Sequence, residues 1–218
     1  KNTIFGKSCV QCNVEIPKSE VVYITVDKER PKIEIVKPKP GDTVKNLNKT
    51  FNGVKVLNDI SVKFETGKTN LIIGRSGSGK TVLLKSIIGL HDIDSGQIWY
   101  EEEQFNKLNF KEKKKIRSEM GMLFQGSALF DSLNVSQNVQ FPLDMFTDMN
   151  PKEKLDRVRF CLDRVNIIDS DKLFPAELSG GMKKRVAIAR AIALNPKYLF
   201  CDEPNSGLDP LTALLIDA

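Results

Sequence analysis

The chain has 218 residues, 40% of them hydrophobic and 28% charged, and its formal net charge is +5. These values are ordinary for one globular domain, or for one domain with a small appendage. No apolar stretch approaches the roughly 20 residues that span a bilayer, and the start of the chain lacks the pattern of a signal peptide. We therefore expect any membrane role to be peripheral and to depend on a partner.

The first 40 residues differ in character from the rest of the chain. Two short apolar runs, at residues 21–26 and 33–36, predict two strands that would form a hairpin. The prolines and glycine of residues 37–41 then predict a linker. Cys9 and Cys12 form a lone C-x-x-C pair without the further ligands that a zinc site needs; a redox pair is the alternative, although no thioredoxin-like pattern surrounds it. We assign residues 1–40 no role.

From residue 42 onward, predicted strands alternate with predicted helices. Residues 54–64 alternate apolar and polar side chains, which predicts antiparallel strands with one buried face. Continuous apolar runs predict further strands at 70–73, 120–124 and 198–201, and the first of these is expected to be covered on both faces. The sequence therefore predicts an α/β domain with a mainly parallel core sheet.

Three helices are predicted between and beside these strands. The first covers residues 80–90 and the last covers the alanine-rich residues 183–194. A helix between them begins at Asn150, the predicted N-cap, followed by Pro151 at the first helical position and Glu153 near the third. Apolar residues then recur in this segment at the three-and-four spacing of one helix face.

A glycine-rich loop between a predicted strand and a predicted helix matches the pattern G-x-x-x-x-G-K-[ST]. Glycines let backbone N–H groups turn toward phosphate oxygens, and the following helix adds its positive N-terminal end. Lys80 is expected to reach the β- and γ-phosphates, and the Thr81 hydroxyl to bind Mg²⁺. The predicted nucleotide-binding residues of this loop are Gly74, Arg75, Ser76, Gly77, Ser78, Gly79, Lys80 and Thr81.

Two carboxylates, Asp202 and Glu203, follow the apolar run at 198–201. We expect them at the carboxyl edge of the sheet, where open α/β folds bind their ligands. Asp202 is predicted to bind Mg²⁺, directly or through water. Glu203 is predicted to orient or deprotonate an attacking water molecule.

A second glycine-containing helix start consists of Ser179, Gly180 and Gly181, followed by Met182. One explanation is an ordinary serine N-cap, and the other is a second anion-binding helix end. Because one domain then contains two such helix starts, the second one is predicted to serve the ATP bound to another copy of the chain.

Together these residues, in this order, resemble the ABC ATPase family from about residue 41 to the end of the chain. The loop at 74–81 resembles the Walker A motif, and the strand ending in Asp202 and Glu203 resembles Walker B. The remaining resemblances are Phe51 to the adenine-stacking aromatic, Gln125 to the Q-loop glutamine, Ser179, Gly180 and Gly181 to the signature motif, and Asp209 to the D-loop aspartate.

The resemblance implies a P-loop NTPase of the ABC type over residues 41–218, with an N-terminal antiparallel β subdomain and a helical subdomain at about 126–178. It implies ATP and Mg²⁺ as cofactors and Lys80, Gln125 and Glu203 as catalytic residues. The residues implied to lie at the magnesium ion are Thr81, Gln125 and Asp202.

The resemblance also implies a second cassette as partner, in a head-to-tail homodimer. Each ATP would lie between the Walker A loop of one copy and Ser179, Gly180 and Gly181 of the other, with Asp209 at the interface. The family's switch histidine would follow the D-loop and is missing from the chain, which we interpret as C-terminally truncated; His91 stands on the wrong side of the motif order to replace it. Met182 departs from the commoner glutamine of the signature.

A narrower resemblance, at residues 79–84, 121–133 and 138–143, is to the ATPases of Mla-type phospholipid transporters. It implies an integral membrane permease that docks near residues 126–146, and a peripheral location on the cytoplasmic face of the inner membrane. Two alternatives stay open: an ATPase of a small-solute importer, and a non-transport cassette that acts on DNA or ribosomes. The chain shows one cassette without coiled-coil insertions, so we expect no nucleic-acid partner.

Overall fold

The computed structural model describes residues 21–26 and 42–203. This part contains a core sheet of order β4-β1-β8-β7, formed by β1 (Val21–Val26), β4 (Thr69–Ile73), β7 (Met120–Leu123) and β8 (Tyr198–Asp202). β7 and β8 are parallel, whereas β1 is antiparallel to both β4 and β8. Hence β4, β7 and β8 point in the same direction, and their carboxyl ends meet at one edge. The prediction of a mainly parallel core sheet is confirmed.

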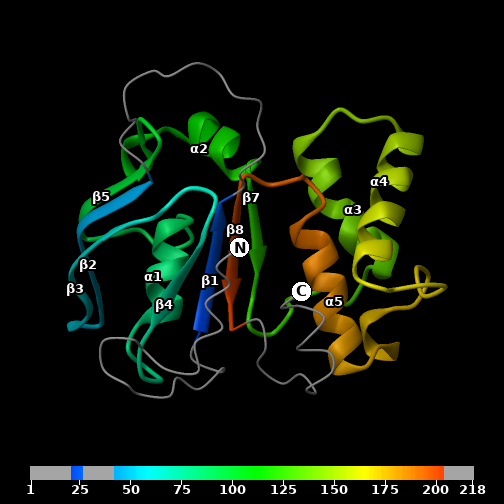
Figure 1. The fold of residues 1–218 in the computed structure, drawn as a ribbon, viewed down its shortest axis with the longest axis horizontal. Coiled ribbons are helices and arrows are strands. Elements are labelled where there is room, and N and C mark those ends of the chain that lie inside the picture. Colours follow the sequence, from blue (N-terminus) through cyan, green and yellow to red (C-terminus); the bar gives the residue numbers. More distant parts are fainter. Residues whose placement is uncertain (1–20, 27–41, 204–218) are drawn as a thin grey trace.

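Strand β1 is the middle element between the strand that precedes the glycine-rich loop and the strand that ends in the two carboxylates (Figure 1). Its backbone pairs with β4 on one side and with β8 on the other, with Tyr23 opposite both Leu71 and Cys201. The strand expected at 21–26 therefore exists, and it belongs to the core sheet. Its predicted partner at 33–36 and the cysteines Cys9 and Cys12 lie outside the described residues.

A second sheet, of order β3-β2-β5-β6, is antiparallel throughout. Its strands are β2 (Thr43–Phe51), β3 (Val54–Lys63), β5 (Ser95–Tyr100) and β6 (Glu103–Gln104). Asn52 and Gly53 join β2 to β3 with φ values of 48° and 79°. Positive φ at both central residues is the requirement of a type I′ hairpin turn, which Asn-Gly meets at low cost. The predicted N-terminal antiparallel sheet is confirmed.

Helix α1 (Lys80–Ile87) packs between the two sheets (Figure 1). Its Leu84 is fully buried in a cluster that also contains Leu47 and Ile98 of the antiparallel sheet and Phe200 of β8. The helix thereby stays fixed relative to β8. The short η2 (Phe105–Lys107) and the basic α2 (Phe110–Arg117) follow the antiparallel sheet.

The prediction that residues 70–73 form a strand covered on both faces is wrong. Leu71 and Ile73 of β4 are 45% and 47% exposed, whereas Ile72 packs against the core cluster. The physical reason is that the core cluster that contains α1 covers only one face of β4. Its alternate side chains on the other face are therefore left uncovered within the described residues.

The helical part consists of α3 (Val135–Phe146), α4 (Pro151–Arg164), η3 (Pro175–Glu177) and α5 (Gly180–Ala191). Its own core contains Val139, Leu162 and Val186, one from each long helix. Helices α3 and α4 lie within the expected range 126–178, and α5, which begins beyond it, completes their core. Across the described residues, no helix has the length and apolar character needed to cross a membrane.

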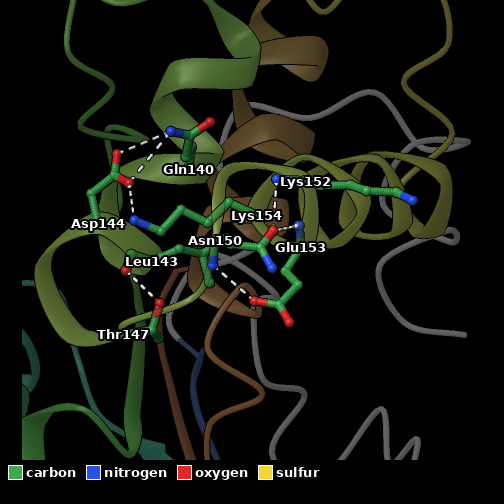
Figure 2. A network of polar contacts seen from close by, with 8 residues as sticks. All are labelled: Gln140, Leu143, Asp144, Thr147, Asn150, Lys152, Glu153 and Lys154. Carbon is green, nitrogen blue, oxygen red and sulfur yellow. Dashed lines mark hydrogen bonds and ion pairs between the residues drawn. The ribbon is translucent and has the colours of Figure 1, made fainter.

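The connection between α3 and α4 is fixed by local polar contacts (Figure 2). Asn150 is the N-cap of α4, as expected, and it forms a capping box with Glu153, in which each side chain is bonded to the other residue's backbone N–H. The Lys154 ammonium lies 2.7 Å from the Asp144 carboxylate of α3. These contacts set the angle at which α4 returns along α3.

Helix α5 is mounted closely on β7. A Cβ at Gly121 of β7 would overlap the carbonyl oxygen of Ala191, so the two backbones approach more closely than any other residue would allow. Just beyond the end of α5, the carbonyls of Ile192 and Ala193 accept hydrogen bonds of 2.8 and 2.7 Å from the Arg157 guanidinium of α4. Helix α5 is therefore held at its end by both the sheet and α4.

Candidate nucleotide-binding and catalytic site

The glycine-rich loop connects β4 to α1 at the carboxyl edge of the core sheet. Gly79, the N-cap of α1, has φ +94°, and a Cβ there would lie 3.1 Å from the Leu57 side chain and 3.3 Å from the Val56 carbonyl. Glycine is thus required both for the left-handed backbone and for the close approach of β3. In the described structure no side chain caps α1, so its first N–H groups face the loop.

Lys80 is 8% exposed, and its ammonium donates to the carbonyl oxygens of Gly74, at 2.7 Å, and Arg75, at 3.1 Å. An ammonium has three N–H donors, and these two hydrogen bonds use two of them. A buried charge needs such partners, because its transfer from water is otherwise costly. The loop therefore holds a positive charge with one donor left for an anion. Residues 75–78 of the loop are exposed.

Thr81 and Asp202 join α1 to the end of β8. The Thr81 hydroxyl donates to the Asp202 carboxylate at 3.0 Å, and Asp202 is 2% exposed. A hydroxyl and a carboxylate beside a phosphate-binding loop fit Mg²⁺, which takes one or two carboxylates together with substrate phosphates. Among the described residues no group of three or more His, Cys, Asp and Glu side chains could hold a metal on its own. Nucleotide phosphates and water would complete the coordination.

Gln125 and Glu203 lie side by side because β7 and β8 are parallel, with Leu123 opposite Cys201. The Gln125 amide nitrogen donates to the Glu203 carboxylate at 2.6 Å, which leaves the amide oxygen available to a cation. Glu203 has φ 48°, in the left-handed region. Such a backbone costs a non-glycine residue about 1–3 kcal/mol and clusters at functional sites.

Lys184 of α5, which the sequence analysis did not single out, lies behind this pair. It is 3% exposed, and its ammonium donates to the backbone carbonyls of Glu203, at 2.9 Å, and Gln125, at 3.3 Å. Burial lowers the pKa of Lys184, and the nearby side chains of Cys201, Glu203 and Asp202 act in the opposite direction. In the sequence Lys184 stands between Lys183 and Arg185, so nothing in its immediate neighbourhood distinguishes it from an exposed basic residue.

The segment after Gln125 is held by two further residues that sequence analysis missed. Ser127 and Ala128 both have left-handed φ values, and the Arg190 guanidinium donates to their carbonyls at 2.8 and 2.7 Å. The fully buried Asn138 donates to the carbonyl of Phe130 at 3.1 Å and accepts from its N–H at 2.9 Å. Helices α5 and α3 thus fix a backbone that has no regular structure of its own.

The predicted signature residues form the start of α5. The Ser179 hydroxyl accepts a hydrogen bond of 3.2 Å from the backbone N–H of Met182, so it is an N-cap. Ser179 and Gly180 are exposed, and Gly181 is half-buried. A Cβ on Gly180 would meet no atom within 4 Å. Since α5 packs beside β7, at the other end of the core sheet from β4, the two glycine-containing helix starts belong to opposite ends of the sheet (Figure 1).

Phe51, the predicted adenine-stacking residue, ends β2 and is 37% exposed. Its ring lies edge-on to His91, with 5.3 Å between centroids, and the Lys49 ammonium lies 5.0 Å from its centroid. These neighbours hold the ring at the surface without covering it. Asp209, the predicted interface residue, lies outside the described residues.

A glycine-rich phosphate loop, a buried lysine and an acidic strand end on a mainly parallel sheet define a P-loop nucleotide-binding domain. The family model described as "ABC transporter" matches residues 57–206, and the chain belongs to this family. The expected ABC cassette fold is thereby confirmed.

Named relatives and solved structures agree with the family. The methionine import ATP-binding protein MetN of Clostridium tetani is 43% identical over 170 residues, 78% of this chain and 53% of that protein. The probable ribonucleotide transport ATP-binding protein mkl of Mycobacterium leprae is 40% identical over 168 residues, 77% of this chain and 48% of that protein. The chain thus spans about half the length of these curated relatives.

A dimeric structure of the ATP-binding cassette MJ0796, bound to ADP and Pi, has a TM-score of 0.73 and 30% sequence identity, and the match covers 80% of this chain and 79% of that one. A second dimeric structure of the same bacterial ABC transporter cassette has a TM-score of 0.74 at the same identity. The phospholipid-transporter resemblance predicted from the sequence is not specifically supported, because these relatives carry other names.

Proposed function

We propose that this chain is the ATP-binding and ATP-hydrolysing part of an ABC transporter. The observation that carries the proposal is the meeting of the Lys80 ammonium, the Thr81–Asp202 pair and the Gln125–Glu203 pair at one edge of the core sheet. The cassette MJ0796, solved with ADP and Pi, supports it.

In this proposal Lys80 binds the β- and γ-phosphates and neutralises their charge. Thr81, Asp202 and the amide oxygen of Gln125 would hold Mg²⁺, which supplies further charge neutralisation at the phosphates when bound. The Glu203 carboxylate orients the attacking water and accepts its proton, and Gln125 orients that carboxylate through their hydrogen bond. Catalysis is then mainly positioning and electrostatic stabilisation, as expected for phosphoryl transfer.

A second copy of the chain would complete each site. Ser179, Gly180 and Gly181 form an exposed helix start with open space in front of Gly180, which suits contact with a nucleotide held by another molecule. MJ0796 was solved as a dimer. We propose a head-to-tail homodimer in which Asp209 also lies at the interface.

A membrane permease would dock on the helical part near residues 126–146. Phe130 and Phe141 are 42% and 38% exposed, their ring centroids are 4.6 Å apart, and Met145 beside them on α3 is 50% exposed. Leu129, by contrast, packs into the helical core. An exposed apolar group on a backbone fixed by Arg190 and Asn138 suits a protein contact. The chain would then lie peripherally at the cytoplasmic face of the inner membrane, and nucleic acid is not among its proposed partners.

The named relatives favour a small solute as cargo, since they are called methionine import and ribonucleotide transport proteins. We therefore propose a small-solute transporter in place of the phospholipid transporter first expected. Phospholipid is kept as the second candidate because residues 79–84 and 121–133 resemble the Mla-type ATPases. In proteoliposomes that contain the full-length protein and its permease, methionine should stimulate ATP hydrolysis; stimulation by phospholipid composition alone would favour the second candidate.

The test of the ATPase itself is Glu203→Gln in the full-length protein. Loss of a general base typically lowers turnover about 10²- to 10⁴-fold, while the isosteric amide leaves nucleotide binding intact. The variant should therefore form stable dimers in ATP, measured by light scattering, and should release almost no phosphate. The matched control is Glu102→Gln, at an exposed turn. Phosphate release near the wild-type rate from the Glu203 variant would contradict the assigned role.

A further inference from the structure

We propose that Lys184 is a positioning residue that sets the relative placement of Gln125 and Glu203 from the helix that begins with the signature residues. The inference rests on the proposed ATPase function, because that function gives Gln125 and Glu203 their roles. Lys184 contacts neither reactant in this proposal and acts through the backbone of the two residues that do.

The hydrogen bonds around Lys184 form a closed circuit. Its ammonium donates to the carbonyl of Gln125 at 3.3 Å and to the carbonyl of Glu203 at 2.9 Å. The side chains of these two residues are joined to each other at 2.6 Å. Displacement of either backbone would therefore also displace the carboxylate that faces the attacking water.

The backbone at Glu203 and Gln125 needs such a stabilising contact. Glu203 lies immediately after β8 with φ 48°, a conformation that persists only where surrounding contacts determine it. Gln125 lies two residues beyond the end of β7, outside the strand pairing. Lys184 is 3% exposed and spans both chain segments, so it supplies contacts that the sheet no longer provides.

The position of Lys184 on α5 connects Gln125 and Glu203 to the exposed start of that helix. It lies four residues after Gly180, about one helical turn from the exposed end proposed to meet a second copy. Helix α5 is itself mounted on β7 through the close approach at Gly121. A change at the exposed helix start would thus reach Gln125 and Glu203 of the same chain through one side chain.

The experiment compares Lys184→Met and Lys184→Arg in the full-length protein. Met keeps the length of the side chain but removes its donors, and Arg keeps them. Lys183→Met is the matched control, because the adjacent Lys183 side chain is half-buried and makes neither of these hydrogen bonds. Steady-state kcat and KM, the Kd for MgATP and the melting temperature are measured for each variant.

Lys184→Met should lower kcat about 10- to 100-fold, as expected for a misplacement near 1 Å, with the MgATP Kd within threefold of wild type. Lys184→Arg should recover most of kcat. Added to Glu203→Gln, Lys184→Met should lower the residual rate less than threefold, because the two residues act as a unit. If Lys184→Met and Lys184→Arg both lost kcat in proportion to melting temperature, Lys184 would be merely structural and the inference would be overturned. Additive losses of kcat in the double variant with Glu203→Gln would also overturn it. A wild-type protein without ATPase activity would overturn the proposed function, whereas an active Lys184→Met protein overturns only the role of Lys184.

Discussion

Two helices of this protein start with glycines at a site proposed to meet phosphate, and the two starts are built differently. Helix α1 begins after Gly79, whose φ of +94° no other residue adopts easily, and no side chain in the described structure caps it. Helix α5 begins after Ser179, whose own hydroxyl accepts a hydrogen bond from the Met182 N–H. One helix start is open at its N–H groups, and the other is partly satisfied by its own chain.

The atoms around Gly79 and Gly180 differ as well, because the first glycine is crowded and the second is not. A Cβ at Gly79 would press on Leu57 and on the Val56 carbonyl, because β3 packs against the loop. A Cβ at Gly180 would meet nothing within 4 Å. The same residue type therefore has two uses: in the loop it permits a strained backbone in a crowded place, and in α5 it leaves room on an exposed face. We call the start of α1 the walled site, because β3 of the same chain packs against it, and the start of α5 the open site, because it requires a partner.

The largest effect that this comparison predicts is at the walled site. Lys80→Met should weaken MgATP binding about 10- to 100-fold, since a hydrogen-bonded charge contributes roughly 1.5–3 kcal/mol. Isothermal titration of ATP into the full-length protein measures the change. Lys85→Met, in the last turn of the same helix, is the control and should bind within threefold of wild type. Undiminished affinity in the Lys80 variant would mean that the α1 start is not the phosphate site.

A matched pair of glycine substitutions sharpens the contrast. Gly79→Ala should destabilise the protein by about 1–3 kcal/mol, because the added Cβ meets Leu57 at 3.1 Å and the left-handed φ is strained. Gly180→Ala should leave stability unchanged or raise it by up to about 1 kcal/mol, since alanine favours a helix. Denaturant unfolding of the full-length protein measures both.

The second half of this prediction concerns association. In the Glu203→Gln background, Gly180→Ala should abolish the ATP-dependent dimer that light scattering detects, because the new methyl group occupies the space in front of the helix start. A dimer that forms normally would show that Gly180 faces solvent in the assembled protein. Equal loss of stability in both alanine variants would remove the distinction between a walled and an open helix start.

The sequence predicts those features that depend on short-range rules. The glycine-rich loop, the strand end at Asp202 and Glu203, and the N-cap at Asn150 are each specified by neighbouring residues, and the structure contains all three. The pairing of Thr81 with Asp202 joins residues 121 positions apart, yet it agrees with the prediction that both residues lie at one magnesium ion. Their assigned roles in catalysis remain predictions for the variants above.

The features that sequence analysis missed are hydrogen bonds from side chains to the backbone of other segments. Lys184, Arg190 and Asn138 donate to carbonyl oxygens, which every residue possesses, so no sequence pattern marks their partners. The place of β1 between β4 and β8 is likewise a matter of chain topology, which the apolar run at 21–26 does not encode. Leu71 is exposed because the core cluster covers only one face of β4 within the described residues, which the composition of the strand cannot reveal.

The smallest predicted effect separates the two explanations of Ser179 that the sequence left open. Removing a serine N-cap costs about 1 kcal/mol in Ser179→Ala, whereas Ser179→Gly costs only a few tenths, because glycine is tolerated at this position. If Ser179 serves only as a cap, glycine should restore both stability and ATP hydrolysis. If its hydroxyl also meets the nucleotide of a second copy, as we propose, Ser179→Gly should unfold at nearly the wild-type denaturant concentration yet hydrolyse ATP as poorly as Ser179→Ala. Full activity in the glycine variant would reduce the α5 start to an ordinary helix cap and leave α1 as the one phosphate-binding helix start of the two.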